Sequence, residues 1–546
     1  MKNGTPTSAV FVCNVILYIE FLYACAIIFK EVLCHTSLCF YKKYGVIFMN
    51  KITKKLCIYT FICLISFLVL FIFSTSTSSL YGNYFEDDSA IFIVMGKAIK
   101  QGLVPYKDVF DHKGPILFFI QALGQLLSEG RNGIFFLQFI MLSFTNILFF
   151  EISKKFCNTS KSLITIIIGM CFFSLFMEEG NLSEELSLPF ITISLYLAIN
   201  WIKSENLFNN KIFLYAFLYG INFSIIAFIR LNNAAPICGL LLGITIIFIF
   251  QKEYKKLLKC IFSFILGVLL VTIPITLYFL KNNALFEMFD ATFLFNFKYI
   301  NTTLYEEYGI MQKLRCSIHI VLLTAIGIPL IRKEKNLVIL LASTSIITYI
   351  LLFIGDGFSH YYVISVPIVI IFISILFNYL QKNSLRKNEQ KLVYFIIIFV
   401  CLMYMCVRII NTVNYLINKK DVSIQNIEKI IDNIPENEKN DIFVYRTYLA
   451  APIYLYGNFM PNYKYAFHQG NLTKVDSSIE LQLDNYLKNN NIKWIISNNL
   501  SNKKNLTETD LYILNNYTLC DKITITLQDF YTLKEEDIFL YKNNIF

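Results

Sequence analysis

The sequence is poor in charged residues for its length. Charged side chains make up 16% of its 546 residues and hydrophobic side chains 56%, whereas a soluble domain carries about 25% charged residues. Phenylalanine, with 52 copies, and tyrosine, with 34, account for much of the apolar excess. This composition excludes a disordered chain, a collagen or coiled-coil fibre and an ordinary soluble enzyme. It predicts a helical, multi-pass membrane protein.

Several short motifs are also missing. The 14 cysteines include no Cys-X-X-Cys pair, and only Cys520 lies in the polar C-terminal part, so neither a disulfide framework nor a cysteine metal site is expected. The chain has no Gly-X-Gly-X-X-Gly or Walker loop. A cytoplasmic nucleotide-sugar or ATP site therefore has no support.

The charges are unevenly distributed along the chain. Residues 419–546 hold 14 basic and 16 acidic side chains, whereas residues 1–418 hold 34 basic and 22 acidic ones. The net charge of +10 thus comes from the apolar part. An excess of lysine and arginine between apolar stretches is typical of cytoplasmic loops and does not indicate nucleic-acid binding. We expect an N-terminal extension (1–48), a transmembrane domain (49–410) and a small extracytoplasmic α/β domain (411–546).

The hydrophobic stretches give the expected spans. A membrane-spanning helix needs about 20 mainly apolar residues. Stretches that approach this length are 56–73, 134–152, 162–177, 186–201, 212–229, 234–250, 260–280, 315–331, 336–354, 361–380 and 392–410. A further apolar stretch at 10–29 is either an extra helix or part of an over-long gene start, since Met49 precedes three lysines and a good span. The chain is therefore expected to span the membrane about 11–12 times.

Basic clusters between the spans predict the topology. Lysine and arginine gather in cytoplasmic loops, and here they gather at 51–55, 154–161, 203–211, 252–259, 332–335 and 382–391. Alternation places the region 81–133 outside at both of its ends. Helices expected at 88–101 and 114–127 would then lie along the outer membrane interface. The alternative is that 114–127 crosses the membrane and the charge rule fails there.

The C-terminal tail has the pattern of a small α/β unit. Apolar runs at 441–445, 492–497, 522–527 and 538–542 are typical of strands, and polar helices are expected near 424–433 and 478–489. The topology places this tail outside. It would act as a cap or acceptor-binding module, or serve only to stabilise the fold.

Two polar clusters lie in the first outer loop. The acidic run Glu86-Asp87-Asp88 comes directly after the first span and suits a general base or a cation site, although a simple helix cap would look the same. The second cluster, Asp111-His112-Lys113, comes just before a helix that begins at Pro115. A lysine ammonium suits a phosphate oxygen, and the imidazole could donate to the same group; a polar turn is the alternative.

This arrangement resembles the first external loop of the GT-C glycosyltransferases, polytopic enzymes that use polyprenyl-phosphate sugars. The aminoarabinose transferase of lipid A and the protein O-mannosyltransferases are members. The resemblance rests on Asp87-Asp88, a helix ending at Gly102, Pro105-Tyr106, and Asp111-His112-Lys113-Gly114-Pro115. Asp in place of the family's usual second Glu, and Gly114 inserted before Pro115, are departures from the family pattern.

Three later clusters lie on the same expected face. They are the acidic segment 178–185, the Arg230-Leu-Asn232-Asn233 segment and the Gly355-to-Tyr362 segment, which contains His360 and Tyr361. Arginine beside asparagine suits phosphate or sugar hydroxyls, and the His-Tyr pair resembles the family's motif near the lipid phosphate. Taken singly, each could equally be a helix cap or a buried polar residue.

The resemblance implies an inverting transfer of a hexose or pentose from a polyprenyl-phosphate donor to a hydroxyl of a glycan, lipid or protein, at the extracytoplasmic face of the plasma membrane. Asp87 would be the general base, with Asp88 beside it in the catalytic pair. Lys113, Arg230 and His360 would hold the phosphate. The remaining candidate substrate-binding residues are Asp111, His112, Glu184, Glu185, Asn232 and Tyr361. A divalent cation near Asp88 or Glu184 is an alternative; no other cofactor is expected.

Two other functions compete with this one. A lipid-linked oligosaccharide flippase or other transporter would need ionisable residues near the middle of the bilayer and often shows inverted repeats, whereas these charges lie at span ends. A polysaccharide polymerase would be expected to carry its catalytic clusters in later, large external loops. The polar cluster at 86–113 argues against it.

Overall fold

The computed structural model describes residues 51–81, 87–300, 310–355, 357–382, 408–410, 422–498, 500, 506–528 and 533–545. The expected extension 1–48 and most of the expected span 392–410 lie outside these residues. The chain divides into two compact units, Met1–Phe61 and Ile62–Phe546. Apart from the first part of α2, the features described below belong to the second unit.

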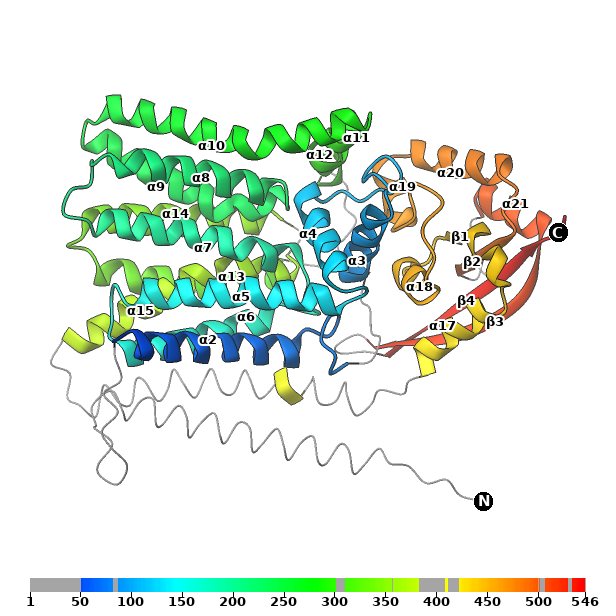
Figure 1. Ribbon diagram of the computed structural model, residues 1–546, viewed down its shortest axis with the longest axis horizontal. Helices are drawn as coiled ribbons and strands as arrows, with labels where there is room; N and C mark the ends of the chain where they lie inside the picture. The colour runs from blue at the N-terminus through cyan, green and yellow to red at the C-terminus, as the bar shows by residue number, and fades with distance from the viewer. Residues whose placement is uncertain are drawn as a thin grey trace, which may run out of the picture. The chain divides into compact units, whose positions relative to one another are not determined.

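The apolar stretches form long helices, which confirms a helical multi-pass membrane fold (Figure 1). Among the described residues, nine helices are long and apolar enough to cross a bilayer. They are α2 (Lys51–Phe73), α5 (Asn132–Ser153), α6 (Thr159–Phe176), α7 (Ser183–Ile202), α9 with the short turn before it (Leu231–Phe250), α10 (Tyr254–Lys281), α13 (Ile310–Leu330), α14 (Lys335–Ile354) and α15 with η3 before it (Ser359–Lys382).

Two apolar helices are shorter. Helix α8 (Lys211–Ala227) covers the expected span 212–229 with 17 residues. Helix α4 (Pro115–Leu127) has 13 residues and is therefore about 20 Å long, too short to cross a hydrocarbon core of about 30 Å. Its length agrees with the expectation that it does not span the membrane alone.

The first loop folds as a helical hairpin. Helix α3 (Asp87–Lys100) is followed by a turn and by α4, which begins at Pro115. Proline suits the first position of a helix because its missing N–H would have no partner there. The two helices pack against each other and lie between the ends of the long helices and the C-terminal strands (Figure 1). This places the polar turn between α3 and α4 beside the end of the bundle.

After α10 the chain forms three short helical pieces. Helix α11 (Leu285–Phe289) leads into the π-helical segment η2 (Asp290–Leu294) and then into α12 (Phe295–Ile300). A π-helical turn is uncommon and often marks a functional site. Here it positions Asn296 so that its amide donates to the carbonyl of His112 at 2.9 Å.

The C-terminal sheet region, residues 422–545, contains a four-stranded mixed sheet in the order β1-β2-β4-β3. Strand β1 (Ile442–Tyr445) is parallel to β2 (Trp494–Asn498). Strand β4 (Leu533–Asn543) is antiparallel to β2 and to β3 (Tyr517–Gln528). The four expected strands are thus present, as are the expected helices α17 (Val422–Asp432) and α20 (Ser478–Asn489). Sequence analysis missed the helices α18 (Ala450–Tyr456), α19 (Gln469–Val475) and α21 (Glu508–Asn516).

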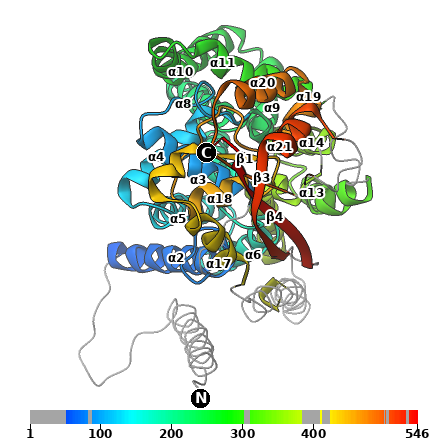
Figure 2. The ribbon, with the colours of Figure 1, turned by 90° about the vertical axis from the view of Figure 1, so that its right-hand side faces the viewer.

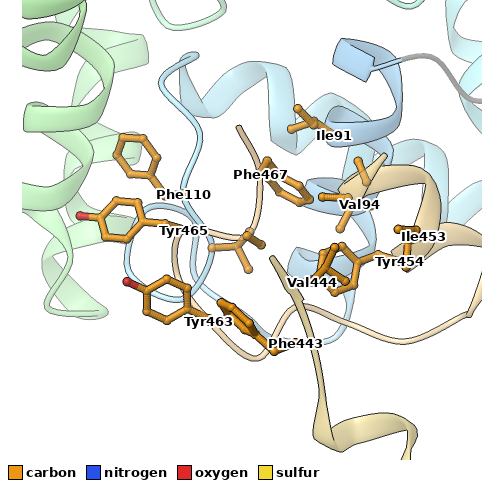
Figure 3. Packing of buried hydrophobic residues seen from close by; sticks show 14 of the residues in the cluster. Ile91, Val94, Phe110, Phe443, Val444, Ile453, Tyr454, Tyr463, Tyr465 and Phe467 are labelled. Atoms are coloured by element: carbon orange, nitrogen blue, oxygen red, sulfur yellow. The ribbon is translucent and has the colours of Figure 1, made fainter. Parts of the chain in front are cut away.

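The C-terminal sheet region shares one hydrophobic core with the first loop (Figure 3). Helix α18 packs on α3, as Figures 1 and 2 both show. Ile91 and Val94 of α3 belong to the same buried cluster as Ile453 of α18. The contact continues along the turn, where the Phe110 ring lies 5.1 Å from that of Tyr465. The polar turn is therefore held from two sides, by the bundle and by the sheet region.

Candidate functional site

Lys113 lies at the centre of the first polar cluster. Its ammonium is 3.1 Å from Asp88 Oδ1 and 3.6 Å from Asp111 Oδ1, and the lysine side chain is 5% exposed. The turn that carries it is fixed by Tyr106, whose hydroxyl donates to the Lys113 carbonyl at 2.7 Å. The Lys113 ammonium also lies 5.3 Å from the centre of the Phe92 ring, which supplies an apolar wall. A single buried cation thus holds two carboxylates from two different segments.

These charged groups shift one another's pKa values. Burial would raise the pKa of Asp88, but the positive charges of Lys113 and the nearby histidines and arginine hold that pKa well below its usual range. Burial likewise opposes the shift at Asp111, where Lys113 and His112 lower the pKa to about 2. Burial and the Lys113 charge lower the pKa of His112, so its imidazole is neutral at pH 7. Both carboxylates are therefore ionised at neutral pH.

Asp111 has one oxygen with no partner. Its Oδ1 accepts from the backbone N–H of His112 at 2.6 Å, whereas Oδ2 is buried and accepts no hydrogen bond from the described residues. A buried, unpaired carboxylate oxygen is costly unless a donor reaches it. A hydroxyl group of a bound molecule could supply that donor.

Arg230 lies at the end of α8 and forms a second cluster. Its Nη1 donates to Glu184 Oε1 at 2.8 Å, and its Nη2 donates to the Tyr361 hydroxyl at 2.7 Å. The guanidinium carbon also lies 4.4 Å from the centre of the Tyr361 ring. The planar fork of arginine allows this combination of two hydrogen bonds and stacking, which a lysine could not reproduce.

His360 and Glu178 form a third cluster. His360 Nδ1 lies 2.7 Å from Glu178 Oε2, and the Ser359 hydroxyl donates to Glu178 Oε1. Burial would raise the pKa of Glu178, but His360 and these donors lower it. The pair joins the loop after α6 to the start of η3 (Ser359–Ser365).

The three clusters belong to one electrostatic site. The charge of Arg230 acts on Asp88, on Lys113 and on His360. Gly114 allows this approach: its N–H donates to the Ile229 carbonyl at 3.0 Å, and a Cβ there would lie 2.1 Å from the Phe228 carbonyl oxygen. The inserted Gly114 is therefore what lets the turn contact the end of α8.

A small cavity of about 50 Å³ opens between these elements. Its polar lining comes from His112, Arg230, Asn232 and Asn296, and its apolar lining includes Phe293 and Phe297. The cavity thus has a cationic side and an aromatic side. Such a shape suits an anionic group attached to an apolar chain.

The C-terminal sheet region contributes His468, which sequence analysis missed. His468 Nε2 lies 4.0 Å from Asp88 Oδ1, and the residue has a left-handed backbone with φ of 48° at the start of α19. Histidine occurs only five times in the chain, so its scarcity was the available signal. Sequence analysis also missed Asn296. The available signal was that this polar residue lies inside an apolar run.

Not every expected site residue joins the cluster. Asp87 is the first residue of α3, and its side chain lies outside the described part. Glu185 is buried but accepts from Gln138 at 3.0 Å, in a separate network. Asn232 is exposed and lines the cavity, whereas Asn233 donates to Ser187. Within the described ranges, no group of three or more histidine, cysteine or acidic residues is arranged to hold a metal ion.

Comparison with solved structures gives the fold. ArnT from Cupriavidus metallidurans, bound to undecaprenyl phosphate, matches with a TM-score of 0.60 and 10% identity over 89% of this chain and 97% of that one. The oligosaccharyltransferase AglB from Archaeoglobus fulgidus, in complex with an inhibitory peptide and a dolichol-phosphate, matches with a TM-score of 0.48 and 11% identity over 81% and 69%. At these identities the likeness to ArnT shows a shared fold.

Comparison of sequences gives the family. No curated protein matches the chain. The family described as "Putative competence-induced protein Ccs4 N-terminal domain" matches residues 47–422. This match ends where the C-terminal sheet region begins and covers more than half of the chain. The protein therefore belongs to that competence-induced Ccs4 N-terminal domain family and has an ArnT-like fold.

Proposed function

We propose that this protein is a membrane glycosyltransferase that moves a sugar from a polyprenyl phosphate to an acceptor hydroxyl. The observation that carries the proposal is the cavity in which Arg230 and His112 face Phe293 and Phe297, beside the Asp88–Lys113–Asp111 cluster. The ArnT structure with the same fold holds undecaprenyl phosphate. The cavity combines the two recognition elements that such a lipid requires.

The donor phosphate would bind at Arg230. The guanidinium lines the cavity, and arginine is suited to phosphate because its N–H groups match two phosphate oxygens. Lys113 is not among the residues that line the cavity, and Asp88 and Asp111 balance its charge, so Arg230 is the cation that would meet the phosphate. The two phenylalanines would contact the first isoprene units, and the rest of the chain would lie in the bilayer.

The reaction would be a single displacement. The acceptor oxygen attacks the anomeric carbon while the bond from that carbon to the phosphate oxygen breaks, and the polyprenyl phosphate leaves with the electron pair. Arg230 would stabilise the negative charge that develops on the leaving phosphate, usually the larger catalytic effect. Attack from the opposite side inverts the anomeric configuration.

The proton of the acceptor hydroxyl would go to the carboxylate of Asp87. Asp88 is less suited to this task because its pKa is held low, so it would orient the acceptor instead. The unpaired Oδ2 of Asp111 offers a second acceptor for a sugar hydroxyl. His468 lies close enough to Asp88 that a small movement would bring the two within hydrogen-bonding distance.

The first test measures lipid binding. Purified full-length protein in lipid nanodiscs is titrated with undecaprenyl phosphate, and bound lipid is counted by native mass spectrometry. We expect saturable binding that Arg230→Gln weakens about tenfold or more, since one charged contact is worth at least about 1.4 kcal/mol. Arg332→Gln, at an exposed arginine of a different loop, is the matched control and should bind normally.

The second test measures transfer. The protein is incubated with a panel of polyprenyl-phosphate monosaccharides and cell-envelope acceptors, and release of free polyprenyl phosphate is followed. Release with one donor, abolished by Asp87→Asn in a folded protein, supports the proposal. Absence of both undecaprenyl phosphate binding and release from every donor would refute it.

The proposed orientation has a separate test. Cys520 is an exposed free cysteine in the C-terminal sheet region. If that region is extracytoplasmic, a membrane-impermeant maleimide should label it in intact cells, and Cys520→Ser should remove the label. Labelling only after lysis would place the site on the cytoplasmic side.

A further inference from the structure

A second cavity, of about 310 Å³, lies within the helical bundle and is almost entirely apolar. Three helices line it with side chains at the same helical spacing, i, i+3, i+4 and i+7, and Trp201 of α7 completes the lining. The lining residues are Ile212, Tyr215, Ala216 and Tyr219 of α8, Leu241, Ile244, Thr245 and Phe248 of α9, and Leu257, Cys260, Ile261 and Phe264 of α10.

The packing of α8 on α10 fixes the place of this cavity. The two helices approach closely at two glycines: a Cβ on Gly220 would lie 2.0 Å from the Phe264 carbonyl oxygen, and one on Gly267 would lie 2.1 Å from that of Phe217. The cavity lies next to this crossing, along the N-terminal halves of both helices. Ile261 lines the cavity and is 46% exposed, so the cavity reaches the outer surface of the bundle.

Tyr219 supplies a polar group without a partner. Its side chain lines the cavity, the residue is 4% exposed, and its hydroxyl makes no hydrogen bond to the described residues. Thr245, also in the lining, donates to the Leu241 carbonyl instead. A buried hydroxyl without a partner costs free energy, and an oxygen from a bound molecule would satisfy it. A pure hydrocarbon chain would not.

Lysines lie at the N-terminal ends of α8 and α10, next to the lining residues Ile212 and Leu257. Lys211 precedes Ile212, and Lys255, Lys256 and Lys259 lie in the first turns of α10, around Leu257. Lys256 pairs with Glu253 at 3.1 Å, while Lys255 and Lys259 are exposed. Positive side chains at the membrane surface attract anionic lipid head groups, by about 1 kcal/mol each.

We propose that this cavity binds one anionic glycerophospholipid. An acyl chain fills the apolar space, an ester oxygen accepts from the Tyr219 hydroxyl, and the phosphate lies among the lysines of α8 and α10. The site is distinct from the candidate catalytic site, since Tyr219 lies about 12 Å along α8 from its last residue, Ala227, and Arg230 lies beyond that end. The lipid would stay bound to the protein and would fill the space between the N-terminal halves of α8 and α10.

The test compares lipids of equal chain length but different charge. Delipidated full-length protein is titrated with phosphatidylglycerol or phosphatidylcholine, and bound lipid is counted by native mass spectrometry. We expect one phosphatidylglycerol to bind about tenfold more tightly than phosphatidylcholine. Lys255→Gln together with Lys259→Gln should remove this preference, and Tyr219→Phe should weaken both lipids about threefold or more.

A cavity-filling variant provides the sharpest control. Ala216→Phe places a ring in the cavity and should abolish tight binding of both lipids, whereas Leu214→Phe, at a site 55% exposed on the same helix, should bind as the wild type does. Unchanged phosphatidylglycerol binding in Ala216→Phe and Tyr219→Phe would overturn the proposal. Displacement of phosphatidylglycerol by an equal amount of undecaprenyl phosphate would also overturn it, since the cavity would then belong to the proposed donor.

Discussion

Replacement of Lys113 by methionine tests the first polar cluster most directly. The ammonium lies 3.1 Å from Asp88 Oδ1 and 3.6 Å from Asp111 Oδ1. At an effective dielectric constant of about 20, each attraction amounts to about 5 kcal/mol. The cost of burying the charges cancels much of this in the intact cluster. It does not cancel in Lys113→Met, where two carboxylates lose the one cation that both contact.

We therefore expect Lys113→Met to lower the free energy of unfolding by about 3–5 kcal/mol, the usual cost of breaking a buried ion pair from one side. Adding Asp111→Asn should recover part of that loss, because one of the two stranded charges is removed. The measurement is thermal and denaturant unfolding of the purified protein in nanodiscs, arranged as a double-mutant cycle.

Lys107→Met is the matched control. Lys107 lies in the same turn, is exposed, and among the described residues donates to the Asn282 carbonyl alone, at 3.0 Å, so its loss should cost less than about 1 kcal/mol. Equal stability of the Lys113 and Lys107 variants would refute the reasoning. A double variant less stable than Lys113→Met alone would refute it as well.

Three further predictions follow from the same site. Arg230→Lys should reduce the rate of sugar transfer at least about tenfold, because one ammonium cannot bond Glu184, stack on Tyr361 and face phosphate at once. Steady-state kinetics would measure this reduction. A kcat/KM equal to that of the wild type would contradict the prediction. His468→Gln should lower kcat and leave the donor KM almost unchanged, because His468 lies near Asp88 and does not line the lipid cavity. A change confined to the donor KM would exclude a role for His468 beside Asp88. The pKa of Asp111 is about 2, against an ordinary 3.8. Ionised Asp111 therefore stabilises the fold above about pH 4, and this contribution to stability is lost as the pH falls toward 2. The gap in melting temperature between the wild type and Asp111→Asn should thus be constant from about pH 8 to pH 5 and close below about pH 4.

Hydropathy predicts much of this fold because a membrane helix is a local property of about 20 residues. In the described part of the chain the long helices coincide with the expected apolar stretches, and α8, with 17 residues, is shorter than a typical span. The strands of the C-terminal sheet region were also expected, whereas the short helices α18 and α19 carry too few residues for a periodic pattern.

The candidate site is harder to predict because it depends on contacts between distant segments. Glu184 and Glu185 are neighbours in the sequence, yet successive helical residues point about 100° apart, so one meets Arg230 and the other meets Gln138. His468 approaches Asp88 across a sequence separation that no local pattern reveals. The expected phosphate role of Lys113 stays a prediction, and the structure adds that two carboxylates already hold its ammonium.

The core shared by the first loop and the C-terminal sheet region has a consequence for biogenesis. The Phe110 N–H donates to the Lys464 carbonyl at 2.8 Å, and the Phe110 ring packs against Tyr465. The turn that carries Lys113 is made early in translation together with Asp88, Tyr106 and Asp111, but Lys464 and Tyr465 are made more than 300 residues later. During insertion the nascent chain would thus carry this turn without its contacts to the C-terminal sheet region. A chain truncated after the spans would retain the helices and lack the contacts that hold the turn from the side of the sheet region.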